Sequence, residues 1–182
     1  FELLDSKVIF TEIIKDGSYA QKGVVIAEVA GNTRALLIGE RIALNILQRL
    51  SGIATKTWQF CEKVKDRNVS IADTRKTTPG MRMLEKYAVR MGGGSNHRYS
   101  LSDGILIKDN HIVAAGGIKN AVLKARSNIP HTIKIEVETE TIEQVKEAME
   151  AGADIIMLDN MSLDMMKEAV TIIDKKALVE AS

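Results

Sequence analysis

Two adjacent cations follow an apolar run in the segment Ile71–Gly80, which reads IADTRKTTPG. Apolar residues from Val69 onward alternate with polar ones, as in a β-strand, and Pro79 with the glycine after it is typical of a turn. Arg75 and Lys76 therefore stand where a strand gives way to a loop. A solvated basic loop is one interpretation, because most charged side chains are exposed. A site for a small anion is the other, and charges elsewhere in the chain favour it.

Charged residues recur at the ends of the predicted strands from residue 68 onward. These strands are Val69–Asp73, Ile105–Lys108, Ile133–Glu138, Ile155–Asp159 and Ala177–Glu180. In a parallel barrel the carboxyl ends of the strands share one face, and the loops that follow them build the active site there. Charges that only solvate a surface would be scattered over both ends of the strands. The pattern therefore predicts a charged, catalytic face.

The charges on this face divide by sign into two groups. The cationic group, which could clamp carboxylate or phosphate, comprises Arg75, Lys76, His97, Arg98 and Lys108. Glu138 and Asp159 form the acidic group, which suggests a bridging Mg²⁺, since this ion takes one or two protein carboxylates and completes its shell with water and substrate oxygens. Glu136 would face the same way as Glu138 on a strand. We favour Glu138 because it is nearer the open end, and Glu136 remains the alternative.

Three consecutive glycines, Gly92–Gly94, precede His97 and Arg98. Glycine can end a helix and can let the backbone approach a ligand closely, although a helix cap followed by a flexible loop would explain the run equally well. We expect His111 to be a hydrogen-bonded structural residue. Zinc and nicotinamide chemistry have no support, because the sequence has no Cys/His ligand spacing, phosphate-binding P-loop or dinucleotide glycine motif.

The elements that must position these residues begin with two predicted strands, Lys7–Thr11 and Gly23–Val29. A helix is predicted from about Gly39, because apolar residues recur at intervals of three and four. These residues are Ile42, Ile46, Leu47, Leu50 and Ile53. Arg41 falls in the first turn of this predicted helix, where a cation opposes the helix dipole. Its side chain should therefore point to solvent or meet an anion supplied from elsewhere.

From residue 68 onward, helices alternate with the predicted strands. They are predicted at Met81–Met91, Ile118–Ala125, Ile142–Met149 and Leu163–Ile173. Thr141 and Gln144 are spaced as a capping box, and Ser162 is a predicted N-cap. Successive strand starts at Ile133, Ile155 and Ala177 are 22 residues apart. Regular βα units of this kind predict a parallel sheet.

Composition restricts the class of protein. The chain has 182 residues, 45% of them hydrophobic, and its 25 basic and 24 acidic residues give a net charge of +1. This balance argues against nucleic-acid binding and favours a local site for a small anion. The single cysteine, Cys61, is expected to be a small buried residue, and a chain without disulfides is cytoplasmic by default. No run has the length of a membrane span, no signal pattern opens the chain, and the start at Phe1 suggests missing upstream residues.

Several motifs, in order, resemble the quinolinate phosphoribosyltransferase family, the carboxylating nicotinate-nucleotide pyrophosphorylases. They are Glu40-Arg41, Leu50–Thr55, Asp73–Thr77 with Pro79-Gly80, Lys86–Arg90, Gly92–Gly94 before Asn96–Arg98, Ile107–His111, Glu136–Glu138 and Leu158–Asn160. The resemblance implies an α/β fold in which a small α/β sandwich domain, residues 1–52, precedes an incomplete parallel (β/α) barrel, residues 53–182. Both domains would be partial, and a glycine-rich loop for the ribose 5′-phosphate would lie beyond Ser182.

The resemblance also implies a reaction and site roles. Quinolinate would react with phosphoribosyl pyrophosphate to give nicotinate mononucleotide, pyrophosphate and carbon dioxide. Arg75, His97, Arg98 and Lys108 would hold the quinolinate carboxylates, Thr74 would join the substrate site, and Lys76 would reach the pyrophosphate. Glu138 and Asp159 would hold Mg²⁺ and the ribose, so that the expected catalytic set is Lys76, Lys108, Glu138 and Asp159. Arg41 would enter the active site of the neighbouring subunit, which implies a homodimer or an assembly of dimers.

Two other functions stay open. A barrel aldolase could use Lys108 or Lys76 as an imine-forming amine, but the acidic pair would then have no role. The chain could also be an inactive anion-binding relative. The phosphoribosyltransferase-like family associated with molybdate transport is close, and Lys108–His111 with Lys86–Ala88 separates the chain from it.

Overall fold

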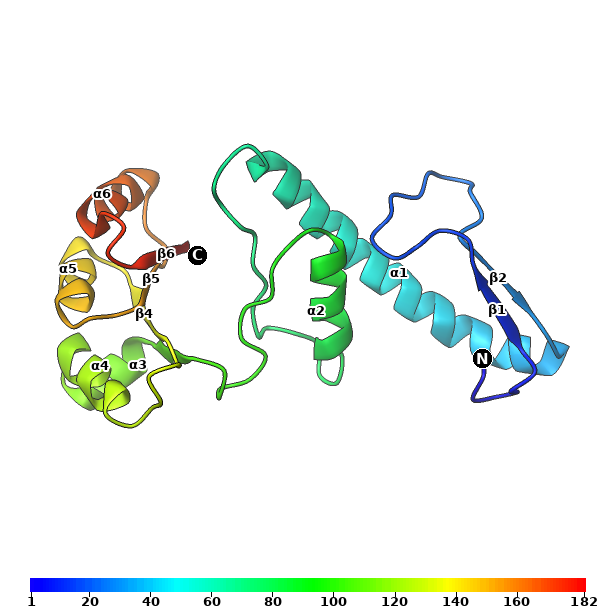
Figure 1. Cartoon of the computed structure of the whole chain (residues 1–182), viewed down its shortest axis with the longest axis horizontal. Helices are drawn as coiled ribbons and strands as arrows, with labels where there is room; N and C mark the ends of the chain where they lie inside the picture. Colours follow the sequence, from blue (N-terminus) through cyan, green and yellow to red (C-terminus); the bar gives the residue numbers. More distant parts are fainter. The chain divides into compact units, whose positions relative to one another are not determined.

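A computed structural model describes residues 1–182, which form two compact units, Phe1–Tyr99 and Ser100–Ser182 (Figure 1). The first unit contains β1 (Ile9–Glu12), β2 (Ala27–Ala30), α1 (Thr33–Val64) and α2 (Arg82–Met91). The second contains β3 (Ile105–Ile107), α3 (Asp109–Ala115), α4 (Ile118–Arg126), β4 (Ile135–Thr139), α5 (Ile142–Glu150), β5 (Ile155–Leu158), α6 (Leu163–Ile173) and β6 (Leu178–Ala181). None of these helices combines the length and the apolar character that crossing a membrane requires.

The first unit opens with an antiparallel pair, β1 and β2, which confirms both predicted strands with shifted bounds. The helix that follows, α1, starts earlier than predicted. Asn32 caps it by accepting a hydrogen bond from the backbone N–H of Arg34, at 2.9 Å. The prediction of a start near Gly39 was wrong because this cap stands ahead of the apolar periodicity that was used to place the helix. Arg41 therefore lies well inside α1, where the dipole of the first turn does not act on it.

Apolar side chains of α1 are largely exposed. Ala35 and Thr57 are the buried residues of this 32-residue helix, whereas Ile42 is 65% and Leu47 42% exposed. The apolar stripe that predicted the helix is thus covered only in part within this chain, since Ile42, Ile46 and Leu47 are exposed and Leu50 and Ile53 are half-buried. Cys61, near the end of α1, is half-buried.

The predicted helix at Met81–Met91 is confirmed as α2, and the glycines after it pack against α1. A Cβ added to Gly92 would lie 2.3 Å from the carbonyl oxygen of Ala54, and one added to Gly94 would lie 2.7 Å from Cγ2 of Thr57. Contacts this short are incompatible with any side chain larger than glycine's hydrogen. The glycine run therefore serves close packing between two segments of the first unit, an explanation the sequence did not suggest.

The predicted strand Val69–Asp73 does not form. Its segment makes a single isolated parallel bridge, between Ala72 and Ser95. Two hydrogen bonds hold the bridge: the N–H of Asp73 donates to the carbonyl of Ser95, at 3.1 Å, and the N–H of Ser95 donates to the carbonyl of Ile71, at 2.8 Å. The segment belongs to the first unit, and the parallel sheet consists of four strands rather than the predicted five.

The second unit confirms the predicted alternation of strands and helices. Its parallel strands are ordered β3-β4-β5-β6, and α4, α5 and α6 lie along one side of the sheet (Figure 1). This is the arrangement of part of a (β/α) barrel. The predicted N-caps are present, since Thr141 accepts from the N–H of Gln144 and Ser162 accepts from the N–H of Met165. The short helix α3 was not predicted.

The two faces of the sheet differ in chemistry. Ile107, Val137 and Ile156 share one face by register and are at most 3% exposed. They pack with the apolar sides of the helices, and burying each such side chain contributes about 1.5 to 3 kcal/mol. Because side chains alternate along a strand, the intervening residues face the other way. These include Glu136 and Glu138 of β4 and Glu180 of β6, which pairs across from Met157.

Candidate active site

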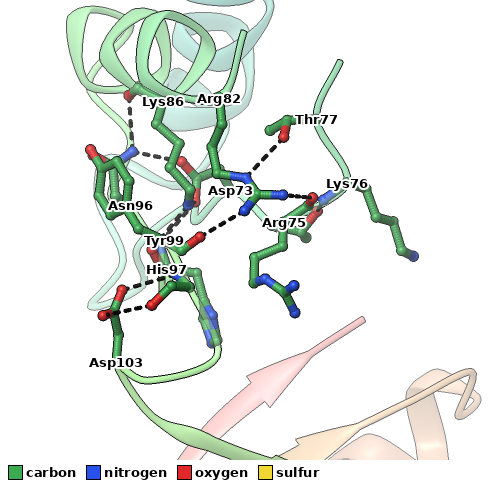
Figure 2. A network of polar contacts seen from close by, with 12 residues as sticks. Asp73, Arg75, Lys76, Thr77, Arg82, Lys86, Asn96, His97, Tyr99 and Asp103 are labelled. Carbon is green, nitrogen blue, oxygen red and sulfur yellow. Dashed lines mark hydrogen bonds and ion pairs between the residues drawn. The ribbon is translucent and has the colours of Figure 1, made fainter. Parts of the chain in front are cut away.

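The carboxylate of Asp73 joins the segment before the Arg75 loop to the segment around His97. It accepts hydrogen bonds from Nζ of Lys86, from Nδ2 of Asn96 at 2.6 Å and from the backbone N–H of His97 at 2.9 Å (Figure 2). Lys86, on α2, also donates to the carbonyl oxygen of His97 at 3.0 Å. The backbone of both segments is therefore fixed by one buried ion pair.

Arg82, also on α2, holds the loop itself. Its guanidinium donates to Oγ1 of Thr77 at 3.1 Å, to the carbonyl of Arg75 at 3.2 Å and to the carbonyl of Tyr99 at 2.9 Å (Figure 2). Three of its nitrogens are engaged by the protein. Arg82 is consequently a structural clamp on the loop that carries the predicted substrate cations.

Glu85 and Arg49 fix the far end of this loop. Glu85 of α2 accepts from the N–H of Thr78 at 3.1 Å and from Arg49 of α1 at 2.6 and 2.9 Å. Burial by itself would raise the pKa of Glu85. The hydrogen bonds from Arg49 and Thr78 outweigh it, so the pKa lies below its ordinary value. Glu85 is therefore held as a carboxylate between α1 and the loop.

The predicted cations of the first unit have different environments. Arg75 is half-buried, and its Nε makes no hydrogen bond within the chain although it is shielded from solvent. Lys76 is exposed, and its N–H donates to Oγ1 of Thr74 at 3.0 Å. Figure 2 shows the side chains of Arg75 and His97 extending to the same side of the network, while that of Lys76 extends away from it. Arg75 thus has donor capacity that the fold does not use.

In the second unit, Lys108 and Glu138 form an ion pair. Nζ of Lys108 lies 2.8 Å from Oε2 of Glu138, and the two side chains are 44% and 16% exposed. Strand register explains the contact. Leu106 of β3 pairs with Glu136 of β4, and Lys108 and Glu138 each follow these residues by two positions, so their side chains are neighbours on the same face. The separation of this site into a cationic and an acidic group therefore does not hold for this pair. His111 is structural, as expected, since its Nδ1 accepts the N–H of Lys108 at 3.0 Å.

Asp159 stands just beyond β5, on the same face of the sheet as Glu138. Glu138 pairs with Met157, and Asp159 follows Met157 by two residues. Its N–H donates to the carbonyl of Thr139 at 2.9 Å, and its carboxylate accepts from the side chain of Asn160 at 3.0 Å. Glu136, the alternative to Glu138, shares this face but is only 3% exposed.

The structure distributes the predicted site residues over both units. The first unit contains Arg41, Thr74, Arg75, Lys76, His97 and Arg98, and the second contains Lys108, Glu138 and Asp159. Arg41 is exposed on α1. Within the first unit the Asp73 network brings the Arg75 and His97 segments together, and within the second Lys108 meets Glu138.

Comparisons with known proteins agree on one family. Residues 53–182 match the family model "Quinolinate phosphoribosyl transferase, C-terminal domain", and residues 2–51 match its N-terminal counterpart. The chain belongs to the quinolinate phosphoribosyl transferase family. The two family regions meet within α1, which runs without interruption from Thr33 to Val64.

Several members of the quinolinate phosphoribosyl transferase family are similar to the chain. The "Probable nicotinate-nucleotide pyrophosphorylase (carboxylating)" of Bacillus subtilis is 53% identical over all of this chain and 63% of its own length. The human nicotinate-nucleotide pyrophosphorylase (carboxylating) is 40% identical over 96% of this chain and 63% of its own length. The structure of NadC from Streptococcus pyogenes matches with a TM-score of 0.94 and 47% identity, over 100% of this chain and 64% of that one. The chain therefore spans less than two thirds of the length of each of these relatives.

The residues that hold the loop around Arg75 in place were not predicted from the sequence. Asp73 and Lys86 entered the sequence argument only as parts of motifs, and Arg49, Arg82 and Glu85 did not enter it. A signal was available, because Arg82, Glu85 and Lys86 stand three and four positions apart and so form a polar stripe on one side of α2. Two of these three side chains, Glu85 and Lys86, are buried. A charged stripe on a helix between apolar positions can thus mark an internal network.

We predict a pH-dependent loss of stability in Glu85→Gln. The folded-state pKa of Glu85 is lowered, so its charge stabilises the protein above the unfolded value near 4.5 and ceases to do so as the pH falls through the folded value. At pH 7 the variant should lose about 1 to 3 kcal/mol in urea unfolding, and the difference should shrink below about pH 4.5. Glu62→Gln, in an exposed ion pair with Lys65, is the control. A difference that does not change with pH would contradict this role.

Proposed function

We propose that the protein transfers the phosphoribosyl group of phosphoribosyl pyrophosphate to quinolinate, with decarboxylation, to give nicotinate mononucleotide, pyrophosphate and carbon dioxide. Family membership and the names of the relatives support this reaction. The observation that carries it is the loop around Arg75. That loop is clamped by Arg82, Glu85 and Arg49, yet it leaves the Nε of Arg75 without a partner in the chain. We place this activity in the cytoplasm, the default for a chain without disulfides.

The first unit supplies the groups that bind a dianion. Arg75 offers a planar fork to one quinolinate carboxylate, and His97 and Arg98 complete the anion site. The exposed Lys76 extends away from the Asp73 network (Figure 2), which suits a role at the pyrophosphate. Thr74 fixes the backbone of Lys76 through its hydroxyl. The backbone that carries Arg75 and Lys76 is held before substrate arrives, so little reorganisation of the loop is needed when charge develops in the transition state.

The second unit supplies charge for the ribose. As the bond from the ribose carbon to pyrophosphate breaks, positive charge develops on that carbon, and the carboxylates of Glu138 and Asp159 are suited to stabilise it. Lys108, held by Glu138, donates to the second quinolinate carboxylate. Ribosylation makes the ring nitrogen cationic. The positive charge on this nitrogen stabilises the electron pair that departing carbon dioxide leaves on the neighbouring ring carbon, and that carbon then uses the pair to take up a proton. The protein needs only to orient the dianion.

Mg²⁺ is part of this proposal. Glu138 and Asp159 are oxygen donors on one face of the sheet, which fits the preference of Mg²⁺ for one or two carboxylates with water and substrate oxygens. They would hold the ion, which when bound neutralises charge on the leaving pyrophosphate. One oxygen of Glu138 is already engaged by Lys108, so the other is the oxygen left for a metal.

The ion pair of Lys108 argues against the aldolase alternative. An imine-forming lysine must direct its Nζ at a substrate carbonyl, whereas Nζ of Lys108 donates a hydrogen bond to the carboxylate of Glu138 at 2.8 Å. Charge pairing of this kind fits the orientation of an anionic substrate better than nucleophilic attack.

Assembly into dimers is also part of the proposal. Arg41 is exposed on α1 among apolar residues that the chain leaves uncovered, such as Leu37, 68% exposed, and Ile42, 65% exposed. Exposed apolar surface of this extent is typical of an interaction site. We propose that a second copy covers this part of α1 and that Arg41 enters its active site.

Arg75→Ala tests the substrate clamp. The intact wild-type protein should form nicotinate mononucleotide from quinolinate and phosphoribosyl pyrophosphate, and a wild type without this activity would refute the proposed function. The variant should lose about 2 to 3 kcal/mol of quinolinate binding, seen as a KM raised roughly 30- to 150-fold. Arg75→Lys should recover only part, because an ammonium cannot bind both carboxylate oxygens as a fork does. Arg67→Ala removes an exposed arginine of the same unit and is the control. Unchanged quinolinate kinetics in Arg75→Ala would remove this residue from the site.

The metal assignment is tested with a chelator. Activity should disappear in excess chelator and return with Mg²⁺, and Asp159→Asn should raise the Mg²⁺ concentration needed for half-maximal activity. Quinolinate binding measured without the second substrate should change little in this variant. Glu168→Gln, on the exposed side of α6, is the control. Full activity in the chelator would contradict the role given to Glu138 and Asp159.

Mixing two inactive variants tests the shared site. Arg41→Ala and Lys108→Ala should each be nearly inactive, because each lacks one part of every active site. After subunit exchange, a mixed dimer has one site with both lesions and one with neither. Random pairing makes about half the dimers mixed, so activity should return to roughly a quarter of the wild-type value. Exchange is verified with differently tagged subunits, and exchange without recovery would show that Arg41 does not act in the partner's site.

A further inference from the structure

The ammonium of Lys86 is buried within the first unit, with its side chain 0% exposed. Burying a charge is costly unless the charge is paired and hydrogen-bonded. Lys86 meets both conditions, because Nζ donates to Oδ1 of Asp73 and to the carbonyl oxygen of His97 at 3.0 Å, and it lies 4.9 Å from the centre of the Tyr99 ring. None of the roles proposed above uses this lysine.

Asp73, the partner of Lys86, lies directly before Thr74, Arg75 and Lys76 in the chain. Its side chain is 9% exposed. Oδ1 accepts from the N–H of His97 at 2.9 Å, and Oδ2 accepts from Asn96 at 2.6 Å. This carboxylate is therefore the junction between the two loop segments that carry the predicted substrate cations.

A carboxylate at this position has an electrostatic consequence. Quinolinate would be bound through its own two carboxylates, which have the same chemistry as the side chain of Asp73. Arg75, which would bind one of them, is only two residues from Asp73. If the charge of Asp73 were not balanced, its oxygens would compete with the substrate for nearby cations, because charge interactions are strong where water is excluded. The ammonium of Lys86 balances that charge from the interior, on the α2 side (Figure 2). The surface cations are thereby left to the ligand.

We propose that Lys86 is a positioning residue for the dianionic substrate. It neutralises Asp73 and fixes the carbonyl of His97, and it touches no reacting atom itself. This inference rests on the proposed function, because the ligand whose binding it protects is quinolinate. A residue that only filled space would be replaced without loss by an apolar side chain of the same length, whereas a charge-balancing residue would not.

The test uses Lys86→Met and the double variant Asp73→Asn/Lys86→Met in the intact protein. Methionine keeps the length of the side chain and removes its charge, which leaves Asp73 unbalanced. The dissociation constant of quinolinate is measured by calorimetry without phosphoribosyl pyrophosphate, and KM and kcat are measured in the full reaction. The exposed pair of Glu62 and Lys65 gives matched controls, Lys65→Met and Glu62→Gln/Lys65→Met, which make the same changes of charge.

We expect Lys86→Met to weaken quinolinate binding at least tenfold, with KM rising by a larger factor than kcat falls. The double variant should bind quinolinate at least threefold more tightly than the single one, because the competing charge has gone. The control variants should match the wild type.

A residue that only filled space makes the opposite prediction, since the double variant has lost more contacts and should be no better than the single one. That result, or unchanged quinolinate binding in Lys86→Met, would overturn the proposal. If Lys86→Met does not fold, charge balance still predicts that the double variant folds, and a double variant that also fails would equally overturn it. A wild type that neither binds nor converts quinolinate would instead refute the proposed function.

Discussion

Asp73 and Lys86 form the interaction on which the first unit's loops depend. A lysine without solvent exposure is tolerated only where its charge is matched, so the position of Lys86 on α2 requires Asp73 at its side. Asp73 in turn fixes the backbone of His97 and the side chain of Asn96. Two chain segments that are more than 20 residues apart are thereby held together although they share only one β-bridge. Hydrogen bonds to the carboxylate of Asp73, rather than those of a β-sheet, hold these two segments together.

In the second unit, the parallel sheet rather than an ion pair positions the charged side chains. The sheet fixes the backbone, and the alternation of side chains along each strand decides which of them face the helices. Ile135, Val137 and Thr139 of β4 are fully buried on one face, which leaves Glu136 and Glu138 for the other. The strands are thus rigid supports that hold carboxylates at fixed spacing, and the ion pair between Lys108 and Glu138 follows directly from register.

The sequence was sufficient where local chemistry decides structure. Strand spacing, the N-caps Thr141 and Ser162 and the helical periods correctly predicted the strands and the three longer helices of the second unit, α4, α5 and α6. The sequence was insufficient where the structure of a segment depends on a contact with a residue far away in the chain. Val69–Asp73 reads as a strand, but its one bridge partner, Ser95, could not be inferred from alternation. Lys86 would be assigned to the surface by any rule based on residue type, because lysine is almost never fully buried unless it is paired. The pairing of Lys108 with Glu138 depends on register, which the sequence does not state.

Hydrogen-bond capacity separates the structural arginines of this loop from the arginine proposed to bind substrate. Guanidinium groups carry five donors and no acceptor, so what matters is how many of them the fold consumes. Arg82 donates to two carbonyls and a hydroxyl, and Arg49 donates to Glu85 and Thr78. Arg75 keeps at least one donor without a partner in the chain. An arginine that donates its hydrogen bonds to groups of the protein holds the loop in place, as Arg82 does. An arginine with a donor that is shielded from solvent and has no partner in the chain, as Arg75 has, can bind an anionic ligand. By this criterion the residues that hold the loop are distinct from the residue proposed to bind substrate. Arg82 and Glu85 of α2, with Arg49 of α1, fix the loop, and Arg75 on the loop keeps a donor for the substrate.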